Sequence, residues 1–372
     1  MKIKSEYIKL LVFFTAVNIF GTFSGSVLPV HYFESGITMT QMVTAQLIIY
    51  LSHLTALVVI RSFSAKIGFY FSTIFSFVQL LLIMHIQSLS QFYLSAVVAG
   101  FVIHFLFTSY NIGHFTNTDK ENVGVSSGLM FSIPRLIGIV FPLIAGYIVG
   151  LDIKILWIIS GIMTFLTVCT IPQIRDFRVT YTILGAIRAA KSVRMFLVLE
   201  GIWEALIFAV IPIYTLKYIH TPEEFGIFVA YIGLVGVIAN MTIGKVTDSI
   251  RKRAVFLFPI TFLLTITTFL FPYFDTSQWG WFVITGLTTF LVPLFWNLTF
   301  ALVLDNTQNH SYSIPGREIL LDVGRIIGLG ATVLSFTYEK TPFLIYYFLG
   351  TAMLGFFLNL TFRRIFKSHS YV

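Results

Sequence analysis

Two glutamates and a histidine lie inside long runs of apolar residues, where an ionisable side chain is costly. Glu200 and Glu204 are one helical turn apart, and His104 lies in a separate apolar run. A carboxylate removed from water tends to hold a proton, so either glutamate could bind and release a proton or pair with a cationic solute. His104 could supply the counter-charge or relay the proton. We predict Glu204 as the first functional group and Glu200 as the second. The alternative is that they pair permanently with neighbours and only fix helix packing.

Polar side chains recur in several apolar runs at a spacing of three or four residues, which places them on one face of a helix. At a rise of about 1.5 Å per residue, Asn18, His104 and Glu204 fall near the middle of their runs, and Asn297 lies slightly off the middle. We therefore predict that they converge on one layer. For Trp296 and His104 the alternatives are ordinary packing and a satisfied hydrogen bond between helices. The predicted substrate and proton pathway comprises Glu204, Glu200, His104, Asn18, Thr22, Thr108, Trp296 and Asn297.

Two arginines, Arg135 and Arg325, also lie in apolar runs and need partners. Glu318 and Asp322 precede Arg325 on one helical face, and Asp322 is close enough to reach it. No acidic residue lies near Arg135 in its own run, so its partner must come from another helix, for which Asp305 is a candidate. Such pairs are either permanent structural contacts or a gate that opens during a functional cycle.

The elements that carry these residues must be membrane helices. Of the 372 residues, 57% are hydrophobic and 11% are charged, whereas soluble domains carry about 25% charged residues. A spanning helix takes about 20 residues, so the chain has room for about twelve. We predict an all-α polytopic membrane protein with twelve transmembrane helices. The single cysteine cannot form an internal disulfide, and no cysteine or histidine spacing predicts a zinc site, so neither a metal nor another cofactor is expected.

Charged and turn residues separate the predicted spans. The spans cover residues 10–31, 42–60, 69–87, 92–110, 128–149, 153–172, 195–217, 226–244, 254–273, 280–303, 318–338 and 342–362. An even number puts both termini on one side, and 21 of the 24 Lys and Arg residues lie on that side or in the helices near it, all except Lys154, Lys217 and Lys340. Cytoplasmic loops are rich in Lys and Arg, so we predict a multi-pass protein of the cytoplasmic membrane with both termini in the cytoplasm. This distribution also accounts for the net charge of +8 without a nucleic-acid partner.

The longest connection on the terminal side, residues 173–194, predicts a linker between two six-helix bundles, residues 1–172 and 195–372. The sequence Arg-Leu-Ile-Gly begins at Arg135, and Arg-Ile-Ile-Gly begins 190 positions later at Arg325. Arginine is rare inside a spanning helix because a charge in hydrocarbon costs at least about 2.5 kcal/mol. Two arginines at equivalent places indicate an internal duplication, and parallel six-helix repeats are a known plan of transporters.

The connection between the eighth and ninth predicted spans has Gly244, then Asp248 four positions later, then the basic cluster Arg251, Lys252 and Arg253. This pattern resembles the cytoplasmic signature of the major facilitator superfamily, in which a second glycine usually stands at the position of Arg251. The resemblance implies two pseudo-symmetric six-helix bundles, a central cavity lined by spans 1, 4, 7 and 10, and alternating access. The candidates for the implied cytoplasmic gate are Gly244, Asp248, Arg251, Lys252, Arg253, Arg135, Asp322 and Arg325. The alternative for the basic cluster is a plain cytoplasmic loop.

These observations predict a secondary active transporter that moves a small solute across the membrane, with a proton as the coupling ion. An export role fits the aromatic-rich spans, and uptake stays open. No loop of the Gly-x-x-x-x-Gly-Lys-Ser/Thr type is present, so an ATP motor is not expected. The expected partners are a small solute, protons and the lipid bilayer, and we expect a monomer that is not an enzyme. The alternatives are a membrane enzyme or lipid-handling protein, and a receptor or scaffold that transports nothing.

Overall fold

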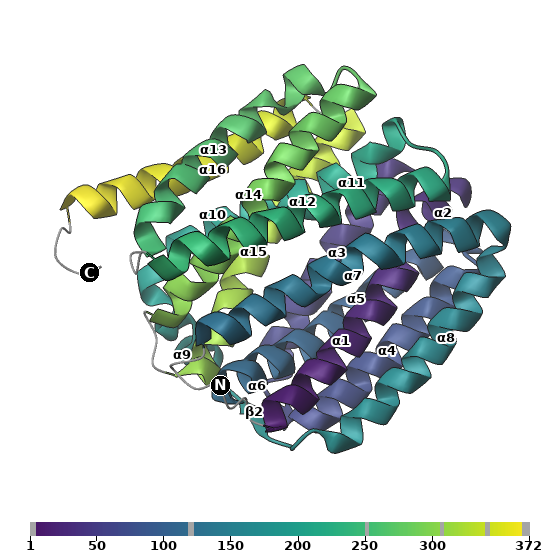
Figure 1. Cartoon of the computed structure of the whole chain (residues 1–372), viewed down its shortest axis with the longest axis horizontal. Coiled ribbons are helices and arrows are strands. Elements are labelled where there is room, and N and C mark those ends of the chain that lie inside the picture. The colour runs from purple at the N-terminus through teal and green to yellow at the C-terminus, as the bar shows by residue number, and fades with distance from the viewer. Residues whose placement is uncertain (1–4, 118–122, 250–252, 306–308, 339–342, 367–372) are drawn as a thin grey trace.

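The structure is a computed structural model that describes residues 5–117, 123–249, 253–305, 309–338 and 343–366, and it is a bundle of long helices (Figure 1). Within these ranges the side chains are described except at residues 117, 123–132, 241–249, 253–255, 301–302, 304–305 and 363–366.

Twelve helical segments among the described residues are long and apolar enough to cross a membrane, which confirms the predicted number. Large apolar side chains such as Ile158 and Phe165 are exposed on them, as lipid-facing side chains are. The protein is therefore a polytopic all-α membrane protein. The twelve segments are Ser5–Glu34, Met39–Val59, Ala65–Met84, Leu89–Thr116, Ile133–Leu151, Ile153–Gln173, Lys191–Lys217, Pro222–Asn240, Phe256–Phe274, Gln278–Phe300, His310–Tyr338 and Phe343–Phe362.

The first six segments are called here the N-half, and several of its helices begin at caps that satisfy free backbone N–H groups. Thr38 and Gln41 form a capping box at the start of α3, and Ser88 and Asp152 cap α5 and α8. The helices of the N-half are α1 (Ser5–Gly25), α2 (Leu28–Glu34), α3 (Met39–Val59), α4 (Ala65–Met84), α5 (Leu89–Ile103), the π-turn η1 (His104–Thr108), α6 (Ser109–Asn117), α7 (Val123–Leu151), α8 (Ile153–Thr170) and the 3-10 turn η3 (Ile171–Gln173).

The last six segments, called here the C-half, follow a linker that contains the short helix α9 (Ile183–Ala189). Prolines 259, 272, 293 and 315 lie inside the long helices of this half. The helices of the C-half are η4 (Lys191–Val193), α10 (Arg194–Ala205), the π-turn η5 (Leu206–Val210), α11 (Ile211–Tyr214), η6 (Thr215–Lys217), α12 (Pro222–Ser249), α13 (Arg253–Phe274), α14 (Gln278–Asp305), α15 (His310–Tyr338) and α16 (Phe343–Phe366).

The two π-turns lie next to residues that the sequence singles out. One begins at His104, and the other begins two residues after Glu204. A π-turn inserts an extra residue into a helix, re-aims the side chains around it and is frequent at functional sites. Both turns therefore mark the fourth and seventh spans as places where the regular helix is altered.

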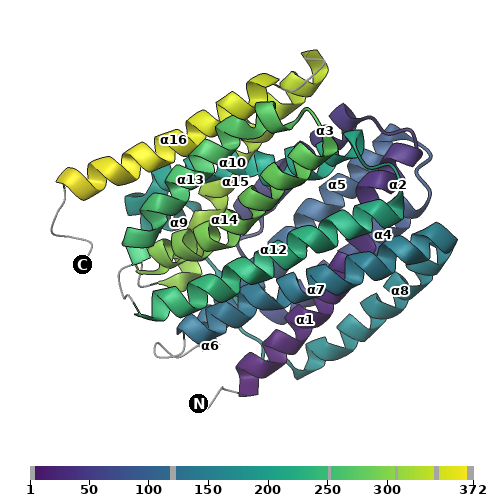
Figure 2. The ribbon, with the colours of Figure 1, turned by 45° about the horizontal axis from the view of Figure 1, so that its top comes forward.

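The two halves meet along two helix pairs, α7 with α12 and α3 with α15. In Figures 1 and 2, α7 and α12 run side by side through the middle of the molecule. A Cβ atom built at Gly233 would lie 2.6 Å from the carbonyl oxygen of Gly138, and one at Gly226 would lie 2.5 Å from that of Pro142. Small residues thus let the two backbones touch, which is the usual basis of helix packing in membranes.

A two-stranded clasp joins the N-half to the linker. Strand β1 (Ser62–Ser64) pairs antiparallel with β2 (Arg178–Thr180), so that Ser62 lies opposite Thr180. The carboxylate of Asp176 accepts hydrogen bonds from the Ser64 hydroxyl at 2.8 Å and the Lys66 backbone N–H at 3.0 Å. β2 and α9 lie at the end of the bundle that carries the N-terminus (Figure 1).

The linker also contacts the C-half. A Cβ atom built at Gly316, near the start of α15, would lie 2.1 Å from the carbonyl oxygen of Ala186 on α9. The linker residues are therefore packed against both halves.

Candidate functional site: a buried acidic network beside an interface cavity

The site depends on an unusually close contact between α10 and α15 within the C-half. A Cβ atom built at Gly324 would lie 2.2 Å from the carbonyl oxygen of Val198, and one at Gly201 would lie 2.2 Å from that of Leu321. A side chain fits at neither place unless a helix moves. The contact places the acidic face of α10 against the charged face of α15.

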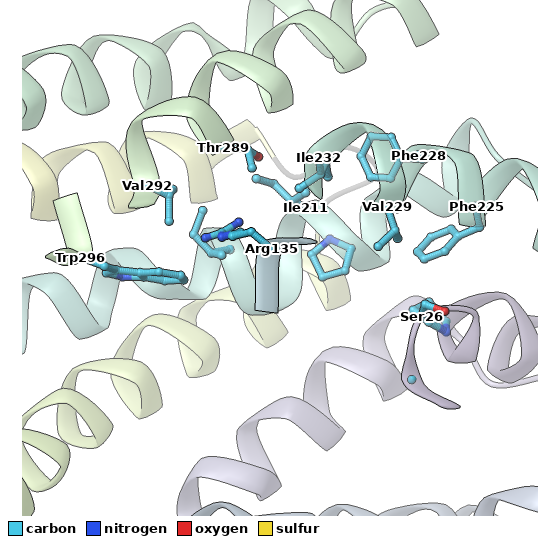
Figure 3. Close-up of a pocket in the computed structure, with 14 residues that line it drawn as sticks. Ser26, Arg135, Ile211, Phe225, Phe228, Val229, Ile232, Thr289, Val292 and Trp296 are labelled. Atoms are coloured by element: carbon cyan, nitrogen blue, oxygen red, sulfur yellow. The ribbon is translucent and has the colours of Figure 1, made fainter. Parts of the chain in front are cut away.

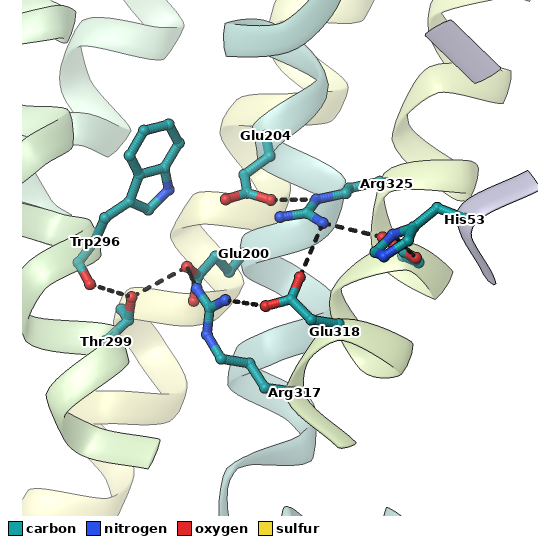
Figure 4. Close-up of polar contacts among 9 residues, drawn as sticks. His53, Glu200, Glu204, Trp296, Thr299, Arg317, Glu318 and Arg325 are labelled. Atoms are coloured by element: carbon teal, nitrogen blue, oxygen red, sulfur yellow. Dashed lines mark hydrogen bonds and ion pairs between the residues drawn. The ribbon is translucent and has the colours of Figure 1, made fainter. Parts of the chain in front are cut away.

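Arg325 on α15 is in contact with three carboxylates (Figure 4). Its Nε donates to Glu204 Oε2 at 2.6 Å, and its Nη1 donates to Asp322 Oδ1 at 3.0 Å. The same Nη1 lies 3.5 Å from Glu318 Oε2. The contact between Asp322 and Arg325 is the one that their spacing predicts. Glu204 is 2% exposed, so its carboxylate faces protein and not lipid.

A second guanidinium, Arg317, continues this cluster toward the start of α15. Its Nη1 donates to Glu318 Oε1 at 2.6 Å, and its Nη2 lies 3.6 Å from Glu200 Oε1. Thr299 on α14 donates to the same Glu200 oxygen at 3.0 Å. The other oxygen of Glu200, Oε2, has no hydrogen-bond partner among the described residues. Glu200 thus has the weakest charge compensation of the four carboxylates.

These side chains form what we call the acidic network, which contains Glu200, Glu204, Arg317, Glu318, Asp322 and Arg325. Four carboxylates face two guanidiniums, so full ionisation would leave two negative charges (4 − 2). None of the six side chains is more than 10% exposed. Because an uncompensated charge is expensive away from water, the network needs a proton or another positive charge.

His53 connects the acidic network to the N-half. It lies on α3, and its Nδ1 is 2.6 Å from Asp322 Oδ2 on α15. Both side chains are at most 1% exposed. A charge on His53 would offset one carboxylate, so the protonation of this pair bears directly on the contact between α3 and α15.

His104 lies beyond His53 and does not contact Glu204. The ring centroids of the two histidines are 6.3 Å apart, and His104 Nε2 lies 3.1 Å from the carbonyl oxygen of Ile60. Thr108, at the other end of the same π-turn, is buried, and its hydroxyl has no hydrogen-bond partner among the described side and main chains. His104 is therefore a neighbour of the network's histidine and not a partner of its glutamates.

Of the four side chains predicted to converge on one layer, Asn18, His104 and Asn297 do not join Glu204 at one site among the described residues. Asn18 and Thr22 line a separate cavity of about 320 Å³ inside the N-half, and Asn18 Nδ2 donates to the carbonyl oxygen of Phe14. Asn297 Nδ2 donates to Asn240 Oδ1 at 3.2 Å. Helical spacing fixes which residues share a face, but it does not fix the rotation of that helix in the bundle.

The predicted gate lies only partly within the described structure. Gly244 and Asp248 are in the last turns of α12, and Arg253 begins α13, but their side chains, and all of Arg251 and Lys252, lie outside the described residues. The predicted pairing of Arg135 with Asp305 also lies outside the described structure, because the Asp305 side chain is not described.

An interface cavity of about 320 Å³ lies between the two halves (Figure 3). Its walls are apolar or aromatic, apart from one guanidinium and the two hydroxyls of Ser26 and Thr289. The N-half contributes Gly25, Ser26, Pro29 and Arg135; the C-half contributes Ile207, Ile211, Pro212, Phe225, Phe228, Val229, Ile232, Thr289, Val292 and Trp296.

Arg135 does not belong to the acidic network, although its sequence motif matches that of Arg325. It lines the interface cavity, where a Cβ atom built at Gly236 would lie 3.0 Å from its Nη1. No ion pair joins Arg135 to an acidic side chain among those described. Among the described side chains, Arg135 therefore lies apart from Asp322 and Arg325, and their shared role in a gate stays a prediction.

The interface cavity and the acidic network share an aromatic wall. Trp296, in the cavity, stacks on Phe208 with ring centroids 6.0 Å apart and planes 17° apart. The guanidinium carbon of Arg325 lies 5.4 Å from the Phe208 ring centroid and 4.9 Å from that of Tyr50. A solute against Trp296 would therefore be two side chains away from Arg325.

The sequence-based candidate set omitted Arg317, His53 and Thr299. One signal pointed to a missing cation: four acidic residues in the seventh and eleventh spans cannot be balanced by Arg325 alone. Arg317, next to Glu318, is the nearest further cation in the sequence. His53 carries the same signal as His104, a histidine inside a predicted span, but its partner lies 269 positions away on the other half and could not be identified from the sequence.

Comparisons with known proteins establish the fold. Neither the protein-family models nor the curated proteins gave a match to this sequence. Among solved structures, the chain resembles one described as a bacterial metal transporter, with a TM-score of 0.65 and 10% sequence identity over 99% of this chain and 100% of that chain. The two proteins thus share a fold over their full lengths.

Proposed function

We propose that this chain is a proton-coupled secondary transporter of the major facilitator type, which moves a small solute across the cytoplasmic membrane by alternating access. Its twelve spans, its likeness to a transporter in fold and the matching motifs at Arg135 and Arg325 support this type. The Lys and Arg bias supports a cytoplasmic location for the end that carries the termini and the clasp.

The observation that carries proton coupling is the charge excess of the acidic network. Four buried carboxylates against two guanidiniums favour at least one bound proton. Glu200 is the best carrier, since one of its oxygens has no hydrogen-bond partner among the described residues and its nearest guanidinium is 3.6 Å away. Glu204, held at 2.6 Å by Arg325, fits better the alternative of a permanent structural pair.

His53 gives the bound proton a way to act on the whole bundle. The pair of His53 with Asp322 joins α3 of the N-half to α15 of the C-half. When protons redistribute within the network, the charge on this pair changes, and with it the strength of the contact between the halves. That is the link a proton-driven rocking motion needs.

The likeness in fold does not indicate which solute this chain moves. At 10% identity the likeness concerns the fold. Among the described residues, no group of three or more His, Cys, Asp or Glu side chains is arranged to hold a metal ion. The interface cavity itself is the better guide to the cargo.

The first test of proton coupling asks whether Glu200 holds a proton at neutral pH. In infrared titration of the purified protein, the carbonyl stretch of a protonated carboxylic acid should be present at neutral pH and should be lost in Glu200→Gln. Glu34→Gln, a matched change at an exposed glutamate on α2, should keep the band.

The second step is transport itself. In proteoliposomes that contain an entrapped pH dye, a transported solute should move protons in wild type and in Glu34→Gln, but not in Glu200→Gln. A solute that is accumulated equally with and without a pH gradient would refute proton coupling.

A further inference from the structure

The interface cavity combines a largely apolar wall with a single cationic group. Phe225, Phe228 and Trp296 provide aromatic surface, and Arg135 provides the guanidinium (Figure 3). A volume of about 320 Å³ lies at the lower end of small-molecule pockets, which run from about 300 to 1,000 Å³. The cavity is therefore large enough for a compact organic molecule.

Arg135, which is half-buried, differs from the two buried arginines in how its charge is compensated. Arg325 contacts three carboxylates and Arg317 contacts two. For Arg135, the described side chains include no carboxylate within ion-pair distance, and the cavity surface around it is apolar. A guanidinium in such a place is stabilised by an anion that enters from the cavity, and its planar fork matches the two oxygens of a carboxylate.

We infer that the interface cavity binds a small organic anion, whose carboxylate pairs with Arg135 and whose apolar or aromatic body packs against Phe225, Phe228 and Trp296. This inference rests on the proposed transport function, because it assigns the cargo of that function. It predicts a binding event that needs no pH gradient.

The position of Trp296 connects this anion to the proton. The solute's body would contact Trp296, which stacks on Phe208, which in turn lies against Arg325 of the acidic network. Solute and proton would therefore act on the same aromatic wall from opposite sides. Binding of the anion should shift the proton affinity of the network, and the reverse effect must be equal in size.

Equilibrium binding tests the inference with three probes that share one apolar body: naphthoate, the neutral naphthamide and the cationic naphthylmethylamine. The readout is calorimetry on the purified full chain in detergent, together with Trp fluorescence. We expect naphthoate to bind more tightly than the other two probes. Arg135→Gln should weaken naphthoate binding by about tenfold to a hundredfold, the loss expected for one charge-assisted contact. Arg135→Lys should restore part of the affinity.

Arg188→Gln, at an exposed position on α9, is the matched control and should bind as wild type does. Each variant is first shown to be folded by its elution volume and its ligand-free melting temperature. The inference is overturned if naphthoate does not bind to wild type, if naphthamide or the amine binds as tightly, or if Arg135→Gln binds as wild type does. Binding that persists without proton-driven uptake would refute the proposed coupling and leave the anion site intact. Proton-driven uptake of cations alone would refute the anion site.

Discussion

At the scale of single residues, the four carboxylates of the acidic network are not equivalent. Glu204, Glu318 and Asp322 each have a guanidinium nitrogen within 3.0 Å, whereas Glu200 has its nearest one at 3.6 Å. Residue type and spacing alone make Glu200 and Glu204 look alike. Their difference comes from Arg317 and Arg325, which approach them from another helix.

This difference gives a prediction for Glu200. Glu200→Gln keeps the shape of the side chain and is neutral, like the protonated form of Glu200 that the proposed function expects at neutral pH. The melting temperature of the purified protein at neutral pH should therefore stay the same or rise, while proton movement in proteoliposomes is lost. A large fall in melting temperature would show that the Glu200 carboxylate is ionised and needed for folding.

Substitution of Arg325 should have the opposite effect on the stability of the protein. Arg325→Met keeps the bulk of the side chain but leaves three buried carboxylates without their shared cation. Breaking a buried pair in this way costs about 3–5 kcal/mol, so the midpoint of denaturant unfolding should fall strongly. Arg188→Met, on the exposed face of α9, is the matched control. An unchanged midpoint in Arg325→Met would mean that the network holds enough protons to be neutral without Arg325.

At the scale of elements, the site depends on the glycines between α10 and α15. Gly324→Ala adds a methyl group 2.2 Å from the Val198 carbonyl oxygen, so the two helices must separate. Overpacking of this kind costs about 1–3 kcal/mol, and it should also weaken the contact of Glu204 with Arg325. Gly330→Ala lies on the same helix with open space around the added carbon, and it should be neutral or slightly stabilising. Equal melting temperatures for the two variants would show that α10 and α15 are not tightly packed.

The clasp between β1 and β2 should depend on pH through Asp176, which lies outside the spans. Slight burial raises the pKa of Asp176, but hydrogen bonds from the Lys66 N–H, the Ser64 hydroxyl and the Phe177 N–H outweigh it and hold the pKa below its ordinary value of 3.8. Because the pKa is lower in the folded protein, the stabilisation is complete above the ordinary value and is lost as the pH falls through the folded one.

Asp176→Asn should therefore lower the melting temperature at neutral pH, and the gap from wild type should close in acid. Glu34→Gln, at an exposed site away from the clasp, should show neither effect. A melting temperature for Asp176→Asn that equals that of wild type at neutral pH would mean that the clasp contributes nothing to stability.

The sequence predicts elements far better than contacts, and the two arginine motifs show why. The spans around Arg135 and Arg325 contain charged residues and are the hardest of the twelve to delimit, but their remaining apolar residues still predict membrane helices. The partners of the arginines depend on how each helix is rotated and on which neighbour touches it. The pairing of Asp322 with Arg325 is predictable since it lies within one helix, whereas the contact of His53 with Asp322 requires the α3–α15 interface. The clasp strands, three residues each, have too little pattern to be predicted at all.

At the scale of the whole molecule, the two halves contact each other at both ends of the bundle. Near the termini, Phe115 of the N-half lies against Phe300 of the C-half, with ring centroids 5.2 Å apart. At the far end, Thr40 Oγ1 donates to the carbonyl oxygen of Phe336 at 3.1 Å. The proposed alternating access would require these two contacts to open in turn, while the interface cavity between them holds the solute.

Spin-label distances can test this rocking motion, and the single native cysteine supplies the first label. Cys169 is exposed at the end of α8, near the termini, and Met195 is exposed at the start of α10. A second pair, Ser35→Cys with Ser277→Cys in a Cys169→Ser background, reports on the far end. When pH is lowered in the presence of naphthoate, the distance between Cys169 and a label at Met195→Cys should lengthen while the far-end distance shortens.

Glu200→Gln should abolish the pH response at both ends, because it removes the proposed proton carrier. Rigid-body rocking is the wrong description if both distances change in the same direction, and a pH response that survives Glu200→Gln would place the proton elsewhere.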